Sequence, residues 1–272
     1  MTIHYTNGII SRRLPISIRN YWFTQRPVIG AMPDIARLHS IPSPVSGAEN
    51  TQSWTLLTDL CGTETELLSR LSRSTRTQVR RAEREGVTVE RLNCNCPETL
   101  DGFERFFNRF ANTKTGFRDV LNVSVQLHML KRYATASMLE ISRAIGLDGK
   151  PVVYHVFIVA GGRARVHHSA SLFRESDNSA QRHFMGWANR FLHWCDMLYY
   201  LQNGYSLYDM GGWYAGRNDE SLLRVNKFKE EFGGKVVCEY DAMVGCSLAG
   251  KMALIARDLI LGLPYAIRKS LH

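Results

Sequence analysis

The chain has 272 residues, of which 44% are hydrophobic and 10% aromatic, with only 8 prolines and 21 glycines. This composition excludes a disordered, collagen-like or low-complexity protein, and the length suffices for one large domain or two small ones. Lysines and arginines (34) exceed aspartates and glutamates (25), which gives a net charge of +9. Such an excess favours an anionic partner: a nucleic acid, a phosphorylated small molecule or an acidic membrane face.

Six cysteines are too few for a disulfide scaffold in a chain of this length, and Cys94 and Cys96 have no second pair at the spacing of a zinc site. We therefore expect reduced thiols and no bound metal. The N-terminal residues lack the apolar stretch of a signal peptide, and no apolar run reaches the roughly 18 residues that a membrane-spanning helix needs. The expected location is the cytoplasm.

The first 50 residues contain five of the eight prolines, which predicts short strands and loops. A strand is predicted at residues 53–60. The helix predicted at 63–85 begins with Thr63 followed by Glu66, which is the spacing of a capping box. Gly86 follows the helix, where a left-handed terminal residue is favoured.

This predicted helix carries one strongly basic side. On a helical projection, six arginines fall within an arc of about 140°, while apolar residues occupy another side. An arginine fork fits phosphate oxygens and stays charged at any working pH. The pattern indicates either a contact with phosphate or RNA, or a solvated helix side. The six are Arg70, Arg73, Arg76, Arg80, Arg81 and Arg84.

The rest of the chain mixes helical and strand patterns. Gly161-Gly162 is a two-residue hairpin signal between two strands. Hairpins among helices favour an α+β fold, with a mixed sheet flanked by helices, over a fully parallel sheet. Helices are predicted at 97–112, 123–135, 180–201, 221–232 and 247–263, and strands at 87–92, 137–145, 151–160, 163–171, 205–210 and 235–244.

Two histidines on the predicted hairpin are candidates for proton transfer. If Gly161-Gly162 forms the turn, His155 lies opposite His168 on one face of the sheet. Facing histidines would suit a proton relay, and the alternative is that neighbours in a half-buried sheet satisfy both rings. No carboxylate is spaced to complete a metal site.

A glycine-rich strand end is a further candidate. The strand predicted at 205–210 includes Tyr208 and Asp209 and runs into Gly211-Gly212, before Trp213. A backbone that bends at a sheet edge either lines a pocket or forms a tight turn that Asp209 caps.

The next predicted helix places a lysine beside two aromatic residues. Phe228 and Phe232 are one turn apart, so they pack together and leave the lysines to neighbouring faces. Lys229 could meet a phosphate or a developing oxyanion. Lysines are common on helices, so this signal is weak by itself.

Two stretches together resemble the Fem-type acyltransferases of the GNAT superfamily. One is the run LLSRLSRSTRTQVRRAEREGVTVE at 67–90, similar to the family's basic helix followed by a strand. The other runs from Gly204 through YDMGG at 208–212 to KFKEEFG at 227–233. The resemblance implies a GNAT-like acyltransferase domain at 51–246, with an N-terminal segment at 1–50 and a C-terminal amphipathic helix and tail at 247–272.

The resemblance also implies an activity, which is transfer of an acyl or aminoacyl group to an amine or, less often, a hydroxyl. In the Fem-type branch the donor is an aminoacyl-tRNA and the acceptor is a cell-wall precursor that carries a diphosphate. A bacterial enzyme acting on a phosphorylated or lipid-linked saccharide of cell-envelope or polysaccharide biosynthesis is therefore expected. Residues 176–184 hold no glycine-rich pyrophosphate loop, so the donor stays open among aminoacyl-tRNA, acyl-CoA and acyl-carrier protein.

The family's lysine carries over to Lys229, as the group that stabilises the oxyanion. His155 or His168, and after them Asp209, is the expected proton acceptor. The expected substrate contacts are Arg76, Arg80, Arg84, Tyr208, Trp213 and Phe228.

The helix predicted at 247–263 has a continuous apolar stripe that includes Leu248, Met252 and Ile255, and Arg268 and Lys269 follow it. Such a helix suits peripheral contact with anionic lipids at the inner face of the cytoplasmic membrane. Packing on its own domain or on a second chain is the alternative.

Two other functions stay open. The chain is either an RNA-binding module whose whole function is the arginine helix, or a catalytically inactive protein with a GNAT-like fold. An RNA binder should lose affinity steeply with salt and should not need Lys229. The sequence does not indicate the oligomeric state.

Overall fold

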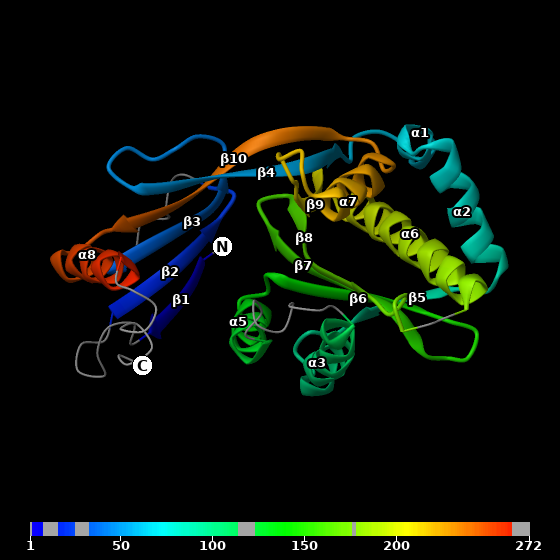
Figure 1. Cartoon of the computed structure of the whole chain (residues 1–272), viewed down its shortest axis with the longest axis horizontal. Helices are drawn as coiled ribbons and strands as arrows, with labels where there is room; N and C mark the ends of the chain where they lie inside the picture. The colour runs from blue at the N-terminus through cyan, green and yellow to red at the C-terminus, as the bar shows by residue number, and fades with distance from the viewer. Residues whose placement is uncertain (1, 8–15, 25–32, 114–122, 176–177, 263–272) are drawn as a thin grey trace. The chain divides into compact units, whose positions relative to one another are not determined.

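The computed structural model describes residues 2–7, 16–24, 33–113, 123–175 and 178–262 (Figure 1). Contacts divide the chain into two compact units, one made of Met1–Ser53 with Cys238–His272 and the other of Trp54–Val237. The boundaries that the resemblance implies, after residues 50 and 246, stay a prediction. In the structure, β10 (Lys235–Gly245) pairs antiparallel with β3 (Ile35–Ile41), so two strands far apart in the sequence belong to one unit.

In its described residues, the first unit is a small sheet with one helix. Its strand β2 pairs antiparallel with β1 and parallel with β3. Side chains of Tyr21, Leu38 and Ile41 form its buried core. The described part of this N-terminal region contains strands and no helix, as the prolines predicted, although Pro15 and Pro27 lie outside the described residues. The further elements are β1 (Thr2–Asn7), β2 (Ile16–Trp22) and α8 (Leu248–Gly262).

The second unit is built on a mixed sheet in the order β4-β9-β8-β7-β6-β5. Its strands pair antiparallel except for β8 and β9, which are parallel. The α+β fold expected from the hairpin signals is therefore confirmed. The elements are β4 (Glu49–Asp59), α1 (Glu64–Arg70), α2 (Arg73–Arg84), β5 (Thr88–Leu92), α3 (Pro97–Asn112), α5 (Val123–Thr135), β6 (Leu139–Ile145), β7 (Pro151–Ala160), β8 (Arg163–Ser171), α6 (Ser179–Gln202), β9 (Leu207–Gly212) and α7 (Glu220–Glu230).

Helices cover both faces of this sheet. The long helix α6 packs on one face, with α2 outside it, and α3 and α5 lie on the other face (Figure 1). The core on the α6 side contains Phe157, Tyr200, Tyr208 and Phe232, all with no exposed surface. This core fixes the ends of β9 and α7 relative to each other, where the candidate site lies.

The prediction of a single helix at 63–85 is wrong, because this stretch forms two helices, α1 and α2. Leu71 is extended, and Ser72 caps the second helix by accepting a hydrogen bond from the Thr75 N–H at 3.1 Å. The Ser72 N–H donates to the Glu231 carbonyl at 2.8 Å, so a residue distant in sequence stabilises the break. The capping box of Thr63 is present as predicted.

Candidate active site

The strand β9 ends in a bulge that faces α7. Thr55 of β4 pairs with Gly212, but Leu57 pairs with Asp209, so β9 carries one extra residue. Gly211 has φ +74°, and a Cβ atom there would lie 2.7 Å from the Val166 carbonyl oxygen. Only glycine fits this conformation and this close approach.

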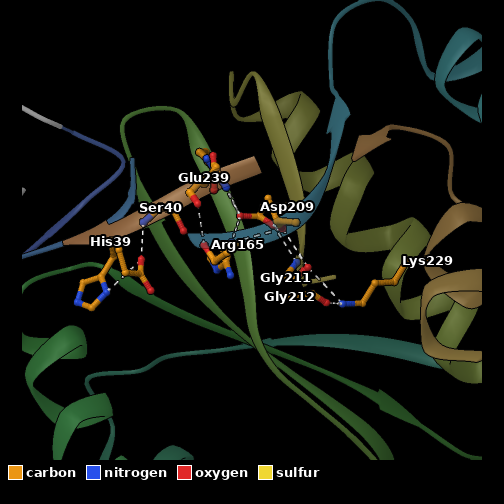
Figure 2. Close-up of polar contacts among 12 residues, drawn as sticks. His39, Ser40, Arg165, Asp209, Gly211, Gly212, Lys229 and Glu239 are labelled. Atoms are coloured by element: carbon orange, nitrogen blue, oxygen red, sulfur yellow. Dashed lines mark hydrogen bonds and ion pairs between the residues drawn. The ribbon is translucent and has the colours of Figure 1, made fainter. Parts of the chain in front are cut away.

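Lys229 of α7 reaches this bulge. Its Nζ donates to the Gly211 carbonyl at 3.2 Å and also to the Gly212 carbonyl (Figure 2). Burial lowers the pKa of Lys229 to about 8, and the Arg165 charge adds to that effect, while the Asp209 carboxylate opposes it. The bulge therefore holds an ammonium group that titrates close to physiological pH.

Asp209 is fully buried, and both of its oxygens are occupied. Oδ2 accepts from Arg163 Nε at 3.0 Å and Arg165 Nη1 at 2.7 Å, and Oδ1 accepts from the Thr55 hydroxyl and from the Gly211 N–H at 2.8 Å. Burial by itself would raise the pKa of Asp209, but the two guanidinium groups outweigh it and lower the pKa. A carboxylate held in this way is a poor proton acceptor, and its geometry suits it to positioning the bulge.

The expected pairing of His155 with His168 is wrong. His155 lies opposite Ser169, and His168 lies opposite Val156, because the β7–β8 register shifts by a bulge between Val156 and Phe157. One extra residue moves a side chain to the other face of a sheet. The two histidines therefore face opposite sides and do not form a relay with each other.

His155 belongs to a buried polar network under α6. Its Nδ1 lies 2.8 Å from Asp196 Oδ2, and its Nε2 lies 2.9 Å from Asn189 Oδ1. The ring centroid of His193 is 4.0 Å away, and His193 Nδ1 lies 2.8 Å from the Tyr208 hydroxyl. His155 has no exposed surface, so its ring does not contact solvent.

Three members of this network were missed from sequence. Asn189, His193 and Asp196 are spaced i, i+4 and i+7, so they share one face of α6. That face is otherwise lined with large apolar residues, and polar side chains at helical spacing within it were the available signal. Asp196 also accepts from Arg91 Nη2 at 2.8 Å, which neutralises its charge inside the core.

His168 packs on the opposite face against α3. Its ring lies 6.0 Å from Phe103 and 5.0 Å from Phe107, measured between centroids. Burial lowers its pKa to about 4. His168 is therefore neutral at physiological pH and a weak base.

The predicted aromatic contacts differ in accessibility. Tyr208 is fully buried and its hydroxyl contacts His193, so the ring does not reach the surface. Trp213 and Phe228 are half-buried at the edge of the core. The guanidinium carbon of Arg190 lies 4.8 Å from the Phe228 ring centroid.

Of the arginines at 70–84, some bind backbone carbonyls of this chain and others have side chains without a partner among the described residues. Arg76 donates to the Leu71 carbonyl at 2.5 Å and to the Ser69 carbonyl at 3.2 Å, which caps the end of α1. The side chains of Arg73, Arg80 and Arg84 are exposed and have no hydrogen bond or ion pair within the described part of the chain. Of the three predicted substrate contacts on this helix, Arg80 and Arg84 are therefore available and Arg76 is engaged.

Two cavities, of about 340 and 190 Å³, are lined by residues other than Lys229 and Asp209. Among the described residues, no group of three or more histidine, cysteine, aspartate or glutamate side chains could hold a metal ion. No helix in the described ranges is long and apolar enough to cross a bilayer. The candidate site consists of the β9 bulge, the buried Asp209 cluster and Lys229.

No protein-family model and no curated protein sequence matches the chain. Among solved structures, it is similar to FemX with a TM-score of 0.54 and 16% identity, over 74% of this chain and 64% of FemX. It is also similar to L-PGS from Bacillus licheniformis (TM-score 0.48, 15% identity, 82% of this chain and 72% of that one). A putative lysylphosphatidylglycerol synthetase C-terminal domain from Agrobacterium fabrum gives a TM-score of 0.47 at 15% identity, over 82% of this chain and 71% of that one.

The similarity to FemX shows that the chain has a Fem-type fold, as the sequence motifs implied. The chain spans less than two thirds of the FemX chain. At 16% identity, the likeness concerns the fold and not the reaction.

Proposed function

We propose that the chain is an acyltransferase whose reaction takes place at the β9 bulge. It moves an acyl or aminoacyl group to an amine, or less readily a hydroxyl, of a phosphorylated or lipid-linked cell-envelope or polysaccharide precursor. The observation that carries this proposal is the Lys229 ammonium group, fixed by two backbone carbonyls in a chain with the fold of FemX.

In the proposed reaction, the acceptor amine attacks the acyl carbonyl carbon, and the carbonyl oxygen becomes negatively charged. An ammonium group has three N–H donors, and Gly211 and Gly212 accept from Lys229. A remaining N–H of Lys229 would donate to the oxyanion. The bond from the acyl carbon to the donor carrier then breaks, and the carrier leaves with its electron pair.

The acceptor nitrogen must also lose a proton. His155 is buried and bonded on both ring nitrogens, His168 is a weak base, and the Asp209 oxygens are occupied. We propose water as the immediate proton acceptor, with His155 or His168 acting only through intervening groups. Under this proposal, Asp209 positions Lys229 and takes no proton.

The donor is proposed to be an aminoacyl-tRNA, an acyl-CoA or an acyl-carrier protein. Native mass spectrometry of the purified protein would identify a co-purified donor. The same three classes, each with a labelled acyl group, would then be offered with an amine-bearing, lipid-linked saccharide. Transfer of label from one class would support the proposal, and absence of transfer from all three would contradict it.

Lys229→Ala is expected to fold normally and to lower transfer by two to three orders of magnitude, roughly the effect of removing one oxyanion donor. Lys227→Ala is the matched control, because Lys227 is an exposed lysine on the same helix. Circular dichroism would confirm the fold of both variants. Full transfer by Lys229→Ala would disprove the assignment.

A second candidate function is RNA binding through α2. The observation that favours it is the row of Arg73, Arg80 and Arg84, whose side chains are exposed and have no partners in the described part of the chain. An RNA-binding module would bind in a strongly salt-dependent manner and would be insensitive to Lys229→Ala. A transferase that uses tRNA as its donor would respond to changes at both places.

A further inference from the structure

The outer face of α8 carries the most exposed apolar side chains of any described helix. Leu248, Met252, Ile255 and Leu259 are 76%, 62%, 60% and 68% exposed. Their spacing of i, i+4, i+7 and i+11 places them in one row along the helix, and the row is roughly 16 Å long. We call these four residues the α8 stripe.

The stripe is not what attaches α8 to its own unit. On the opposite side, Ala253 is buried and Gly250 lies against the Asp34 backbone, where a Cβ atom would come within 1.9 Å of the carbonyl oxygen. Arg257 forms an ion pair with Glu49. These contacts hold the helix in place, so the stripe points away from the sheet and is available to a partner.

Lys251 is exposed beside the stripe, and Arg257 forms ion pairs with both Glu49 and Asp258. In the sequence, Arg268 and Lys269 follow the helix, although both lie outside the described residues. A row of apolar side chains beside an exposed lysine suits a helix that lies in a lipid–water interface and contacts anionic headgroups.

A second copy of the chain is the other occupant to consider. Four side chains on one helix offer a few hundred Å², whereas a stable dimer buries roughly 800 Å² on each partner. Binding to a bilayer requires no such minimum buried area, because the transfer of each apolar side chain out of water is favourable by itself. The size of the stripe therefore favours lipid over self-association.

We propose that α8 docks the protein on an anionic phospholipid surface by inserting Leu248, Met252, Ile255 and Leu259 below the headgroups. The proposal goes beyond the transferase activity and does not depend on it, since neither Lys229 nor the β9 bulge takes part. If both proposals hold, docking would bring the enzyme to the surface where a lipid-linked acceptor resides.

The test is flotation of the full-length protein with vesicles of phosphatidylcholine alone or with about one third phosphatidylglycerol. The variant Met252→Gln/Ile255→Gln/Leu259→Gln should bind the anionic vesicles at least about tenfold more weakly than the parent chain. Because these side chains are exposed, the variant should keep its circular dichroism spectrum and thermal midpoint. Transfer with a water-soluble acceptor should also be unchanged, which separates this proposal from the proposed function.

The matched control is Leu147→Gln, since Leu147 is 75% exposed but lies in the second unit. It should bind vesicles as the parent chain does. Lys251→Glu should weaken binding to anionic vesicles while leaving residual binding to neutral ones unchanged. Equal flotation of the triple variant and the parent chain would overturn the proposal. A lipid-free dimer that disappears in the triple variant would also overturn it, by assigning the stripe to a second copy.

Discussion

Lys229 and Asp209 show how a partly buried cation can be kept charged. Burial and Arg165 lower the pKa of Lys229, whereas the Asp209 carboxylate raises it, and the balance is a pKa of about 8. The proposed role of Lys229 requires the protonated form. The rate of transfer should therefore fall as pH rises through about 8.

Asp209→Asn should move this fall in rate to lower pH. The amide can still accept from the Gly211 N–H, but it removes the negative charge that favours protonated Lys229. The measurement is kcat against pH, with thermal unfolding to check the fold. Asp59→Asn is the control, because Asp59 is an exposed carboxylate at the end of β4.

Lys229→Arg is a second test of whether Lys229 causes the fall in rate near pH 8. A guanidinium stays charged throughout this pH range, so any activity that remains in this variant should not fall near pH 8. A fall in rate at the same pH in the parent chain, Asp209→Asn and Lys229→Arg would show that another group titrates.

At the scale of the element, α2 carries two kinds of arginine: one that stabilises the fold, and others that are available to bind a partner. Arg76 caps α1, whereas Arg80 and Arg84 are exposed without partners in the described residues. If Arg80 and Arg84 contact phosphates, each contact should increase the magnitude of the negative slope of log affinity against log salt concentration by about one.

Arg80→Gln/Arg84→Gln should weaken binding to bulk tRNA and lower that slope by about two. Fluorescence anisotropy over a series of salt concentrations would measure it. Arg76→Gln should instead cost about 1 kcal/mol of stability through the lost cap and leave the slope unchanged. Equal slopes for the double variant and the parent chain would mean that this side of the helix is only solvated.

Local signals located most elements, and tertiary contacts decided the exceptions. The spans of α3 and α5 agree with the predicted ones, because Pro97 and apolar periodicity mark a helix within a few residues. The break at Ser72 depends on the Glu231 carbonyl, which no local pattern reveals. The bulge that separates His155 from His168 likewise has no glycine to mark it.

The candidate site was predictable only in part, because some of its residues carry local sequence signals and others do not. The glycines after Asp209 mark the bent end of β9, and the lysine next to Phe228 marks α7, so both halves carry local signals. The two arginines that neutralise Asp209 come from β8 and carry none. Sequence therefore suggested a proton acceptor at Asp209, where the structure shows a carboxylate held by two guanidinium groups.

At the scale of the whole molecule, two histidines with lowered pKa values should make stability depend on pH. Burial lowers the pKa of His168 to about 4 and that of His193 well below its usual value. The unfolded chain binds the His168 proton near pH 6.5, so the stability that His168 contributes is fully present above that pH and is lost as pH falls toward 4. His168 contributes up to about 1.4 kcal/mol per pH unit in that window, and His193 acts in the same direction.

His168→Phe should therefore reduce the loss of stability between pH 7 and pH 5. The ring would join Phe103 and Phe107 without a group that takes up a proton. Urea unfolding at the two pH values gives the free energies. His183→Gln is the control because His183 is exposed on α6, and an unchanged pH dependence in His168→Phe would contradict this account.

The pairing of β3 with β10 has a consequence for biosynthesis. A ribosome makes β3 first and then adds nearly two hundred residues before β10 emerges, which takes on the order of 10 to 40 s at 5–20 residues per second. During that time one edge of β3 has no strand beside it, while the residues of the second unit can already collapse around α6. The second unit should therefore fold before the first unit is complete. During this delay, the unpaired edge of β3 can bind chaperones or other nascent chains.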